Sequence, residues 1–417
     1  MRGGGPVHGI ADLDALSGAI VGLVRSTLTP PARRGQPIEA VHPGAVADLS
    51  EAFTSVRSGL PPGYLSQPRW RAAYLLYFVP TGVAPLLSVL DRAGERTRLR
   101  QLPRLRVLDL GAGPLTASLA LAVDGPPSQV LDIVAVDGCR AALDDGLALL
   151  RTVRPQAQVR TVVGNLRDGR LLRDLGIFDV IVCLNTLNEW DQGGRKAVTV
   201  GAWSENLVRH HLAPDGRLVL VEPATRRASH ALLDVRAHLL GAGTARATSP
   251  CFTQGPCPLH EPSMRDWCHA EAPWQRPAHI AAIDQAIGHA RRTLKSSHLI
   301  VARPGAAVTD VGTLGYRAIG GVMRDGDVVR RYLCGAAGRT TAELRGPSDD
   351  PVFSAVANAW RGDSVRVPGD PEVRDDESIL AIGSWQRPHV ANSPHPPRDR
   401  PRPTAPSRRR AQRAQRP

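Results

Sequence analysis

The 417-residue sequence predicts an α/β fold built around a parallel sheet. Between residues 101 and 305, short apolar stretches alternate with segments in which alanine and leucine recur at helical spacing. This alternation is typical of βαβ units, whose parallel strands are joined by crossover helices. The apolar stretches contain few polar residues, as strands covered by helices on both faces do. With 42% hydrophobic residues, the chain can bury a sizeable core.

The predicted strands and helices follow one another along this region. The strand segments, several of which run into the following turn, are LRVLDLGAG (105–113), VLDIVAVDG (130–138), VRTVVGNL (159–166), FDVIVCLNTL (178–187), GRLVLVEPA (216–224) and SHLIVARPG (297–305). The helix segments are PLTASLALAVDG (114–125), RAALDDGLALLRTV (140–153), AVTVGAWSENLVRHHL (197–212) and HALLDVRAHLL (230–240). A Cys-rich insert at 242–278 interrupts the sheet before its last strand.

Three further regions flank this α/β domain of residues 101–305. Residues 1–100 are predicted to form a helical N-terminal region, in which the segment 69–94 contains two helices broken near Pro80. Short apolar stretches joined by Gly/Asp turns predict a small β subdomain at 306–385. Residues 386–417 are rich in arginine and proline and almost free of apolar residues, so a disordered basic tail is expected there.

The formal charge of +13 favours a polyanionic partner such as RNA. Lys196 and Lys295 are the only lysines, so 50 of the 52 basic residues are arginines, a bias that a GC-rich genome also produces. Nine arginines and one aspartate give the tail +8 of the total charge. The tail is therefore either a solvated segment or a basic arm that contacts RNA.

The N-terminal segment MRGGGPVHGIADLD lacks the charged start and long apolar stretch of a secretory signal. No run of the sequence approaches the roughly 20 apolar residues that span a bilayer, so no membrane partner is expected. The six cysteines are then interpreted as thiols or metal ligands of a cytoplasmic chain, and not as disulfides.

A nucleotide site is predicted at the carboxyl ends of the parallel strands, where ligands of open α/β sheets bind. Glycines after the first strand let a ligand approach the backbone, the acid after the second can bind ribose hydroxyls, and an asparagine after the third can read an adenine amino group. The candidate cofactor-binding residues are Asp109, Gly111, Gly113, Asp137, Asn165 and Asn185. This pattern predicts a class I S-adenosylmethionine-dependent methyltransferase-like, Rossmann-like sheet. The alternative, a dehydrogenase-type dinucleotide domain, would usually carry G-x-G-x-x-G.

Methyl transfer itself is less strongly indicated. Leu115 stands near the position where a third glycine is common, and it could crowd the methionine end of the cofactor. The segment LNTLNEW after the fourth strand lacks the Asn/Asp-Pro-Pro-aromatic motif of base-methylating enzymes. Asn185 is the one weak catalytic candidate, because it ends the fourth strand near the expected methyl donor. Glu222, at the end of the fifth strand, either supports the fold or lines the pocket.

Four cysteines form the candidate metal site: Cys251, Cys257, Cys268 and Cys334. Thiolates are soft ligands that suit iron–sulfur clusters and zinc. The gaps of five, ten and 65 residues favour a four-iron cluster over zinc, whose sites usually contain tight C-x2-C pairs. The absence of any metal is the other alternative, and His260 or His269 could replace one ligand. Cys257, between two prolines, could instead serve as a nucleophile. Cys139 and Cys183 are interpreted as structural thiols.

Together, these motifs resemble the methyltransferase-like assembly factors of the mitochondrial ribosomal small subunit and their bacterial relatives. The likeness covers residues 65–365 and is carried by VLDLGAGP, YFVPTGV, CLNTLNEW, CFTQGPCPL with DWCH, YLCGAAGR and AWRGD. It implies that the cysteines at positions 251, 257, 268 and 334 hold a 4Fe–4S cluster and that the chain binds small-subunit rRNA during maturation. It also implies that the methyltransferase fold can be catalytically silent.

Two functional hypotheses follow. The first is a ribosomal small-subunit assembly factor, monomeric when free, that binds rRNA through a methyltransferase-like fold stabilised by the cluster. The second is an active S-adenosylmethionine-dependent rRNA methyltransferase, for which an obvious base is not required because positioning supplies much of the rate. A module that binds only proteins is the third interpretation.

Overall fold

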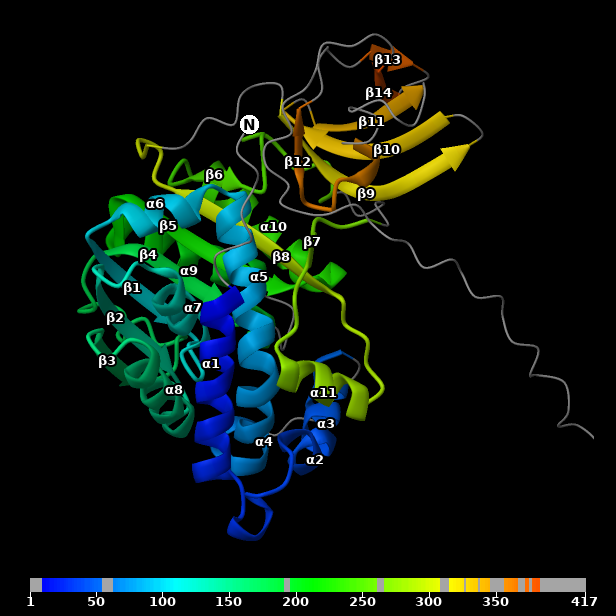
Figure 1. The fold of residues 1–417 in the computed structure, drawn as a ribbon. Helices are drawn as coiled ribbons and strands as arrows, with labels where there is room; N and C mark the ends of the chain where they lie inside the picture. The colour runs from blue at the N-terminus through cyan, green and yellow to red at the C-terminus, as the bar shows by residue number, and fades with distance from the viewer. Residues whose placement is uncertain are drawn as a thin grey trace, which may run out of the picture.

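The structure is a computed structural model that describes residues 10–54, 63–190, 196–260, 266–307, 315–325, 328–336, 338–345, 356–366, 372–374 and 377–382. In Figure 1, helices surround one large sheet, and a second sheet lies beyond one end of it. The predicted basic tail, 386–417, lies outside the described residues.

Eight strands of the described chain form the large sheet. They are β1 (Arg104–Leu110), β2 (Val130–Asp137), β3 (Gln158–Val163), β4 (Phe178–Leu184), β5 (Leu212–Pro223), β6 (Arg246–Ser249), β7 (Ala270–Pro273) and β8 (Thr293–Ala302). The spatial order is β3-β2-β1-β4-β5-β8-β6, and β7 also pairs with β8.

This strand order identifies the fold. Strands β1 to β5 are parallel, and β8 is antiparallel to its neighbours β5 and β6. A parallel sheet whose order reverses between its first and fourth strands, closed by an antiparallel strand inserted before the edge strand, is the topology of class I methyltransferases. The predicted methyltransferase-like, Rossmann-like class is confirmed.

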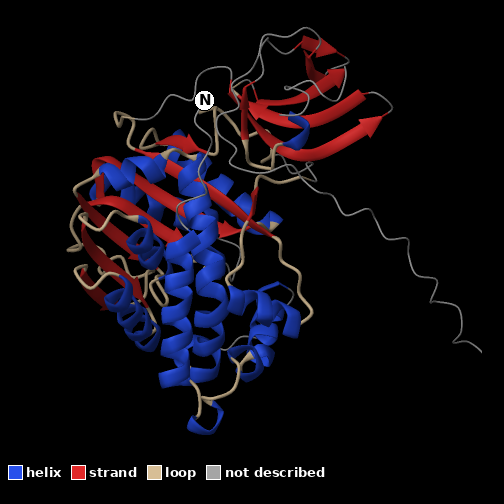
Figure 2. Cartoon of the chain, in the orientation of Figure 1, coloured by secondary structure: helices blue, strands red, loops and turns tan. Residues whose placement is uncertain are grey.

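Helices cover both faces of the sheet (Figure 2). One face is covered by α1 (Ile10–Leu23), α5 (Val79–Arg92), α7 (Thr116–Asp124) and α8 (Arg140–Val153), and the other by α9 (Lys196–His210) and α10 (Arg226–Gly241). Successive strand residues point to opposite faces. In β1, Val107 therefore joins the core beneath the first set of helices and Leu108 the core beneath the second.

Shorter helices complete the N-terminal region and the segment before β8. They are α2 (Ile38–Val41), α3 (Pro43–Thr54), α4 (Pro68–Ala73), α6 (Glu95–Gln101) and α11 (Ala278–Ala286), with helical turns at Val24–Leu28, Pro31–Arg33, Tyr64–Ser66, Tyr74–Phe78 and Leu187–Glu189. In Figure 1, α2, α3 and α11 lie together below the sheet.

The expected break near Pro80 is wrong, because α4, the π-helical turn Tyr74–Phe78 and α5 form one continuous run. Pro80 has no N–H to offer the carbonyl of Leu76, four residues earlier. The ring of His279 on α11 supplies the missing donor, with Nε2 2.9 Å from that carbonyl oxygen. A partner from elsewhere in the chain thus lets the helix continue through the proline.

The same run, Pro68–Arg92, is the one helix among the described residues that is long and apolar enough to cross a membrane by length and composition. The most apolar 18-residue window of this run has a mean hydropathy of 1.7, which corrects the expectation that no such segment exists. Burial accounts for this apolar character, since 67% of the most apolar window lies inside the structure. Val83 and Leu86, for example, are fully buried in the core.

A second sheet forms after β8. Its strands are β9 (Gly315–Asp325), β10 (Val328–Gly335), β11 (Gly338–Arg345), β12 (Ser364–Arg366), β13 (Glu372–Arg374) and β14 (Glu377–Ile382). They are arranged in the order β12-β9-β10-β11-β14-β13. Ala318, Val329, Leu333 and Leu344 form the centre of a separate hydrophobic cluster, so this sheet has a core of its own.

Gly146 on α8 supports the turn that follows β1. A Cβ at this position would lie 2.4 Å from the backbone carbonyl carbon of Pro114 and 2.9 Å from Leu115 Cβ. We expect Gly146→Ala to lower the free energy of unfolding by about 1–3 kcal/mol, because overpacking outweighs the gain of about 1 kcal/mol in helix propensity. Urea denaturation measures the change. Gly18→Ala in α1 is the control, since nothing lies within 4 Å of its added Cβ. Equal effects of the two substitutions would contradict the assigned role of Gly146.

Candidate functional site

The turn after β1 brings the glycine motif to the carboxyl edge of the parallel strands. Gly111 and Gly113 have φ values of +70° and +51°, a backbone conformation that residues with a side chain rarely adopt. The Gly113 N–H donates to Asp137 Oδ2 at the end of β2, over 2.8 Å. The acidic residue predicted to bind a ribose therefore also holds the glycine turn in place.

Asp137 is surrounded by backbone donors. Its Oδ1 accepts from the Cys139 N–H at 2.7 Å. Burial raises the pKa of Asp137, and hydrogen bonds from Cys139, Gly113 and Gly138 oppose that rise. An ionised carboxylate can accept about four hydrogen bonds, so Asp137 keeps acceptor capacity for the hydroxyls of a ligand.

The other predicted residues of this edge follow neighbouring strands. Asn165 is exposed after β3, and its Oδ1 accepts from the Arg167 N–H at 3.0 Å. Asn185 follows β4 with a positive φ of +57°, and its N–H donates to the Val221 carbonyl of β5 at 2.8 Å. Leu115 also has a positive φ, +58°, but its side chain is fully buried in the core that includes α7 and α8.

Asp109, predicted to bind the cofactor, is turned into the protein. It is 1% exposed, and its Oδ2 accepts from the Ser118 N–H and hydroxyl at 2.9 and 2.7 Å. Burial raises its pKa to about 6, against the Ser118 hydrogen bonds, and the nearby Asp137 raises it further. In this structure the Asp109 carboxylate anchors the start of α7.

The raised pKa of Asp109 predicts that the stability of the protein depends on pH. The folded protein binds the Asp109 proton more tightly than the unfolded chain, so ionisation reduces stability as the pH rises from about 4 through about 6. We expect the free energy of unfolding of the wild type to fall by about 2 kcal/mol relative to Asp109→Asn across that window. Denaturant titrations of both proteins at pH 4, 5, 6 and 7 measure the difference. A constant difference at all four values would mean that the pKa is not raised.

Glu222 has a structural role among the described contacts. It is 1% exposed at the end of β5, and its two oxygens accept from the N–H groups of Leu187 and Asn188 at 2.8 and 3.1 Å. These donors begin the helical turn Leu187–Glu189, whose first N–H groups have no partner within the turn. Glu222 therefore fixes the segment after β4 that also contains Asn185.

Tyr74 from the N-terminal helix reaches the same edge, which the sequence did not indicate. Burial raises its pKa, and the nearby carboxylates of Glu189, Asp137, Asp109 and Glu222 raise it further. Tyr74 also packs against Phe53 and Phe78, with ring centroids 6.4 and 5.6 Å away. An aromatic group from the N-terminal region thus borders the predicted nucleotide site.

The four predicted metal ligands come together from the segment between β6 and β7 and from strand β10. Burial first raises the pKa of Cys268, and the neighbouring thiols of Cys251, Cys257 and Cys334 raise it further. Burial raises the pKa of Cys334 to about 12, with additions from Cys251 and Cys257. The pKa of Cys257 is raised by burial and by Cys251. Every pair among the four thiols is therefore close enough for its charges to interact.

Contacts of Arg317 give independent support for this convergence. Arg317 on β9 lies directly opposite Cys334 on β10, so both side chains project from the same face of the second sheet. Arg317 Nε donates to the carbonyl of Pro250, the residue before Cys251, at 2.6 Å. One side chain therefore connects the strand of Cys334 to the loop of Cys251.

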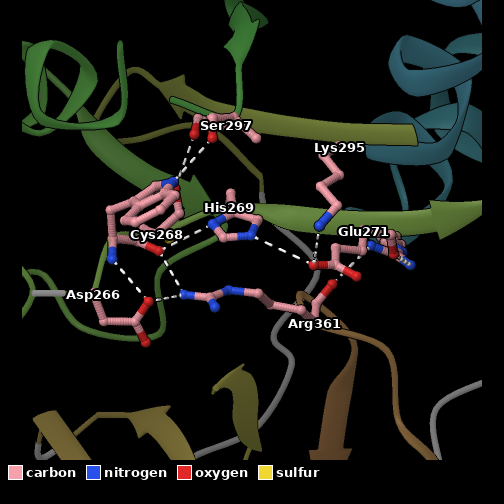
Figure 3. A network of polar contacts seen from close by, with 10 residues as sticks. Asp266, Cys268, His269, Glu271, Lys295, Ser297 and Arg361 are labelled. Atoms are coloured by element: carbon pink, nitrogen blue, oxygen red, sulfur yellow. Dashed lines mark hydrogen bonds and ion pairs between the residues drawn. The ribbon is translucent and has the colours of Figure 1, made fainter. Parts of the chain in front are cut away.

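Cys268 is held in place through its own backbone (Figure 3). Its carbonyl accepts from the hydroxyls of Ser229 on α10 and Ser297 on β8, at 2.7 and 2.9 Å. On the preceding residues, Arg361 pairs with Asp266 and donates to the Trp267 carbonyl at 2.7 Å. Both hydroxyls and the guanidinium belong to elements distant in sequence, so the position of Cys268 depends on the tertiary fold.

Residues 69–304, more than half of the chain, match the sequence model of the family described as mitochondrial small ribosomal subunit Rsm22. The chain belongs to the Rsm22 family. The suspected relationship to methyltransferase-like factors of the ribosomal small subunit is confirmed. The match covers Cys251, Cys257 and Cys268 and ends before Cys334.

Solved structures similar to this Rsm22-family chain include several methyltransferases. YcgJ from Bacillus subtilis is 15% identical, with 52% of this chain and 99% of that chain covered and a TM-score of 0.30. Precorrin-6y C5,15-methyltransferase from Geobacter metallireducens is 14% identical, with 51% of this chain and 88% of that chain covered and a TM-score of 0.30. Fibrillarin from Aeropyrum pernix, with natively bound S-adenosyl-L-methionine, is 13% identical, with 51% of this chain and 74% of that chain covered and a TM-score of 0.29. No curated protein matches the chain.

The four predicted ligands do not form a metal site in the described residues of this Rsm22-family chain. In the part of the chain that the structure describes, no three His, Cys, Asp or Glu side chains are arranged to hold a single metal ion. His260 pairs with Asp234 at 2.8 Å, and His269 with Glu271 at 3.6 Å. Cys183 is fully buried in the core beneath α9 and α10.

Proposed function

We propose that this Rsm22-family chain is a ribosomal small-subunit assembly factor. In this proposal it binds rRNA through its methyltransferase-like fold, and a 4Fe–4S cluster held by four thiolates stabilises the fold. The residues that would hold the cluster are Cys251, Cys257, Cys268 and Cys334. The mutual proximity of these thiols supports the proposal most strongly.

The donor set suits a cluster better than a single ion. A four-iron cube is larger than one ion, so its cysteine ligands stand further apart than the ligands of zinc and come from separate segments. Pairwise interactions among all four thiols, which come from separate segments, agree with that requirement. When bound, the cluster would supply a covalent connection between the two sheets.

The connection suggests a mechanical role. Cys251, Cys257 and Cys268 lie in the segment between β6 and β7, and Cys334 lies on β10 of the second sheet. A centre bound by both would fix the orientation of the second sheet relative to the first. A rigid surface lowers the entropic cost of binding a large RNA, because fewer groups become ordered on association.

The first experiment is anaerobic purification of the full chain, followed by analysis of iron and sulfide. About four of each per chain, with broad absorption near about 400 nm, is the expected result for this cluster class. Zinc without sulfide, or no metal, would overturn the cluster. Co-sedimentation with small ribosomal subunits at several salt concentrations then tests the partner. Binding that weakens steeply with salt is expected if rRNA phosphates are contacted.

The glycine turn favours a second candidate function, S-adenosylmethionine-dependent methylation of rRNA. Gly111 and Gly113 would admit the cofactor to the backbone, Asp137 would bind its ribose, and Asn185 would lie near the methyl donor. The cofactor supplies an electrophilic methyl group. Calorimetry with S-adenosylmethionine tests binding, and labelled methyl incorporation into small-subunit rRNA tests turnover. No heat at high cofactor concentration would favour the silent scaffold.

A further inference from the structure

Two arginines lie inside the protein beside the cysteine segments. Arg236 on α10 is 2% exposed, and Arg317 on β9 is 6% exposed. A guanidinium remains charged in proteins, so each brings a positive charge into the interior. Such a charge is strongly unfavourable there unless an anion compensates it.

Each arginine reaches the thiol group by contacts of its own. Arg236 donates to the carbonyls of Thr253 and Gly255, between Cys251 and Cys257, at 2.6 and 2.9 Å. It also lines a small cavity together with Cys251 and Cys268. Its Nε is buried and has no hydrogen-bond acceptor among the residues that the structure describes.

Arg317 approaches from the second sheet. It lies opposite Cys334 in the strand register and donates to the carbonyls of Pro250 and Gly362. Its guanidinium carbon lies 5.5 Å from the centre of the Phe252 ring, next to Cys251. The two arginines thus contact the cysteine loop from different elements.

Neither arginine has a carboxylate partner in the described residues. No aspartate or glutamate oxygen there lies within 4 Å of either guanidinium, whereas the buried Arg92 and Arg217 each pair with one. The carbonyl contacts satisfy N–H groups but leave two positive charges uncompensated. Four thiols are the groups nearby that can supply negative charge when they bind a metal centre.

We propose that Arg236 and Arg317 are the counter-charges of the thiol-bound centre, and that the free Nε of Arg236 donates to one of its sulfurs. This inference rests on the proposed cluster and extends it. A four-iron cluster with its four thiolates carries a net charge of about −2 when oxidised, which two guanidiniums balance. The arginines are positioning residues for the cluster and set its reduction potential.

Balanced charge has a measurable effect on reduction. One-electron reduction by dithionite adds a further negative charge to the cluster, and a nearby guanidinium stabilises that charge. Removing one of these two positive charges from the protein interior therefore lowers the reduction potential of the cluster. We expect at least a tenfold shift of the one-electron equilibrium toward the oxidised form, equivalent to about 59 mV.

The experiment separates the effect of the positive charge from the effect of the guanidinium shape at each arginine. Full-length wild type, Arg236→Gln, Arg236→Lys, Arg317→Gln and Arg317→Lys are reconstituted anaerobically. Iron content and the midpoint potential from a spectroscopic redox titration are measured. Glutamine keeps a hydrogen-bond donor without the charge, and lysine keeps the charge without the two-carbonyl contact. Arg209→Gln, at an exposed ion pair with Glu205, is the matched control.

The expected result is a lowered potential or loss of the cluster in both glutamine variants, with lysine variants and Arg209→Gln close to the wild type. Wild-type potentials in the glutamine variants would overturn the counter-charge role. Loss of the cluster in the lysine and glutamine variants alike would also overturn it, because shape rather than charge would then be required. A wild type without iron and sulfide would instead remove the proposed function itself.

Discussion

A Cys268→Ser variant is expected to purify without its iron and to unfold at a lower temperature than the wild type. Cys268 interacts with all three other thiols, and a serine hydroxyl is a poor ligand for iron in a cluster. Loss of a structural metal centre removes binding free energy that contributes to folding. We expect Tm to fall by about 5 °C or more, which corresponds to roughly 4 kcal/mol for a protein of this size. Iron analysis and thermal unfolding by circular dichroism measure the two effects.

The control for this variant is Cys139→Ser. Cys139 is the residue directly before α8, and the pairwise interactions within the thiol group do not include it. It should retain the iron content and Tm of the wild type. Cys268→Ser should also co-sediment less with small ribosomal subunits, because the two sheets are no longer connected by the centre. Full iron content in Cys268→Ser would rule out a four-thiolate ligand set.

The large sheet was predictable because its strands carry their own signal. The stretch from Leu105 to Leu110 is apolar and ends in a glycine turn, and the next strands repeat this pattern. Local hydrophobicity and turn chemistry are enough to define such elements. Their order in the sheet also follows common rules for parallel strands, which makes the fold class accessible from sequence.

Elements stabilised from a distance were not predictable. Strands β6 and β7 are four residues each, with sequences RATS and AEAP that have little strand character, and both form by pairing with β8. The helix through Pro80 depends on His279, about 200 residues later. Local propensity contains no information about such a partner, so tertiary contacts decide the outcome.

The candidate sites also combine features that the local sequence predicted with features that depend on distant contacts. Residue type and spacing singled out Asp137 and the four cysteines, because ribose and metal recognition require those groups. The sequence did not indicate that Asp109 faces Ser118, that Tyr74 borders the nucleotide edge, or that Arg236 and Arg317 contact the cysteine loop. Each of these arrangements joins segments far apart in the chain.

The contacts of Arg92, which we call the Arg92 joint, connect the two sheets independently of the thiols. At the end of α5, Arg92 pairs with Asp363 at 3.0 Å, and it donates to the Glu271 carbonyl on β7 at 2.7 Å. The Asp363 backbone carbonyl in turn accepts from Ala318 on β9. Arg92 and Asp363 are 11% and 7% exposed, so the ion pair is largely removed from water.

Replacing Arg92 by methionine is therefore expected to be costly. Removing one partner of a buried ion pair leaves the other charge uncompensated, at about 3–5 kcal/mol. The double variant Arg92→Met/Asp363→Asn should recover part of that loss, because the amide carries no charge and still accepts from the Trp360 N–H. Arg69→Met, at the exposed pair with Asp48, should change the free energy of unfolding by less than about 1 kcal/mol.

Hydrogen exchange distinguishes a joint from a general stabilising contact. If Arg92 holds the second sheet against the first, amides of β7, β9 and β12 should lose protection in Arg92→Met at denaturant concentrations where β1, β4 and β5 keep theirs. A uniform loss across both sheets would contradict the joint. In a protein that holds iron, the same segments should lose protection further when Arg92→Met is combined with Cys268→Ser, because two separate connections between the sheets have then been removed.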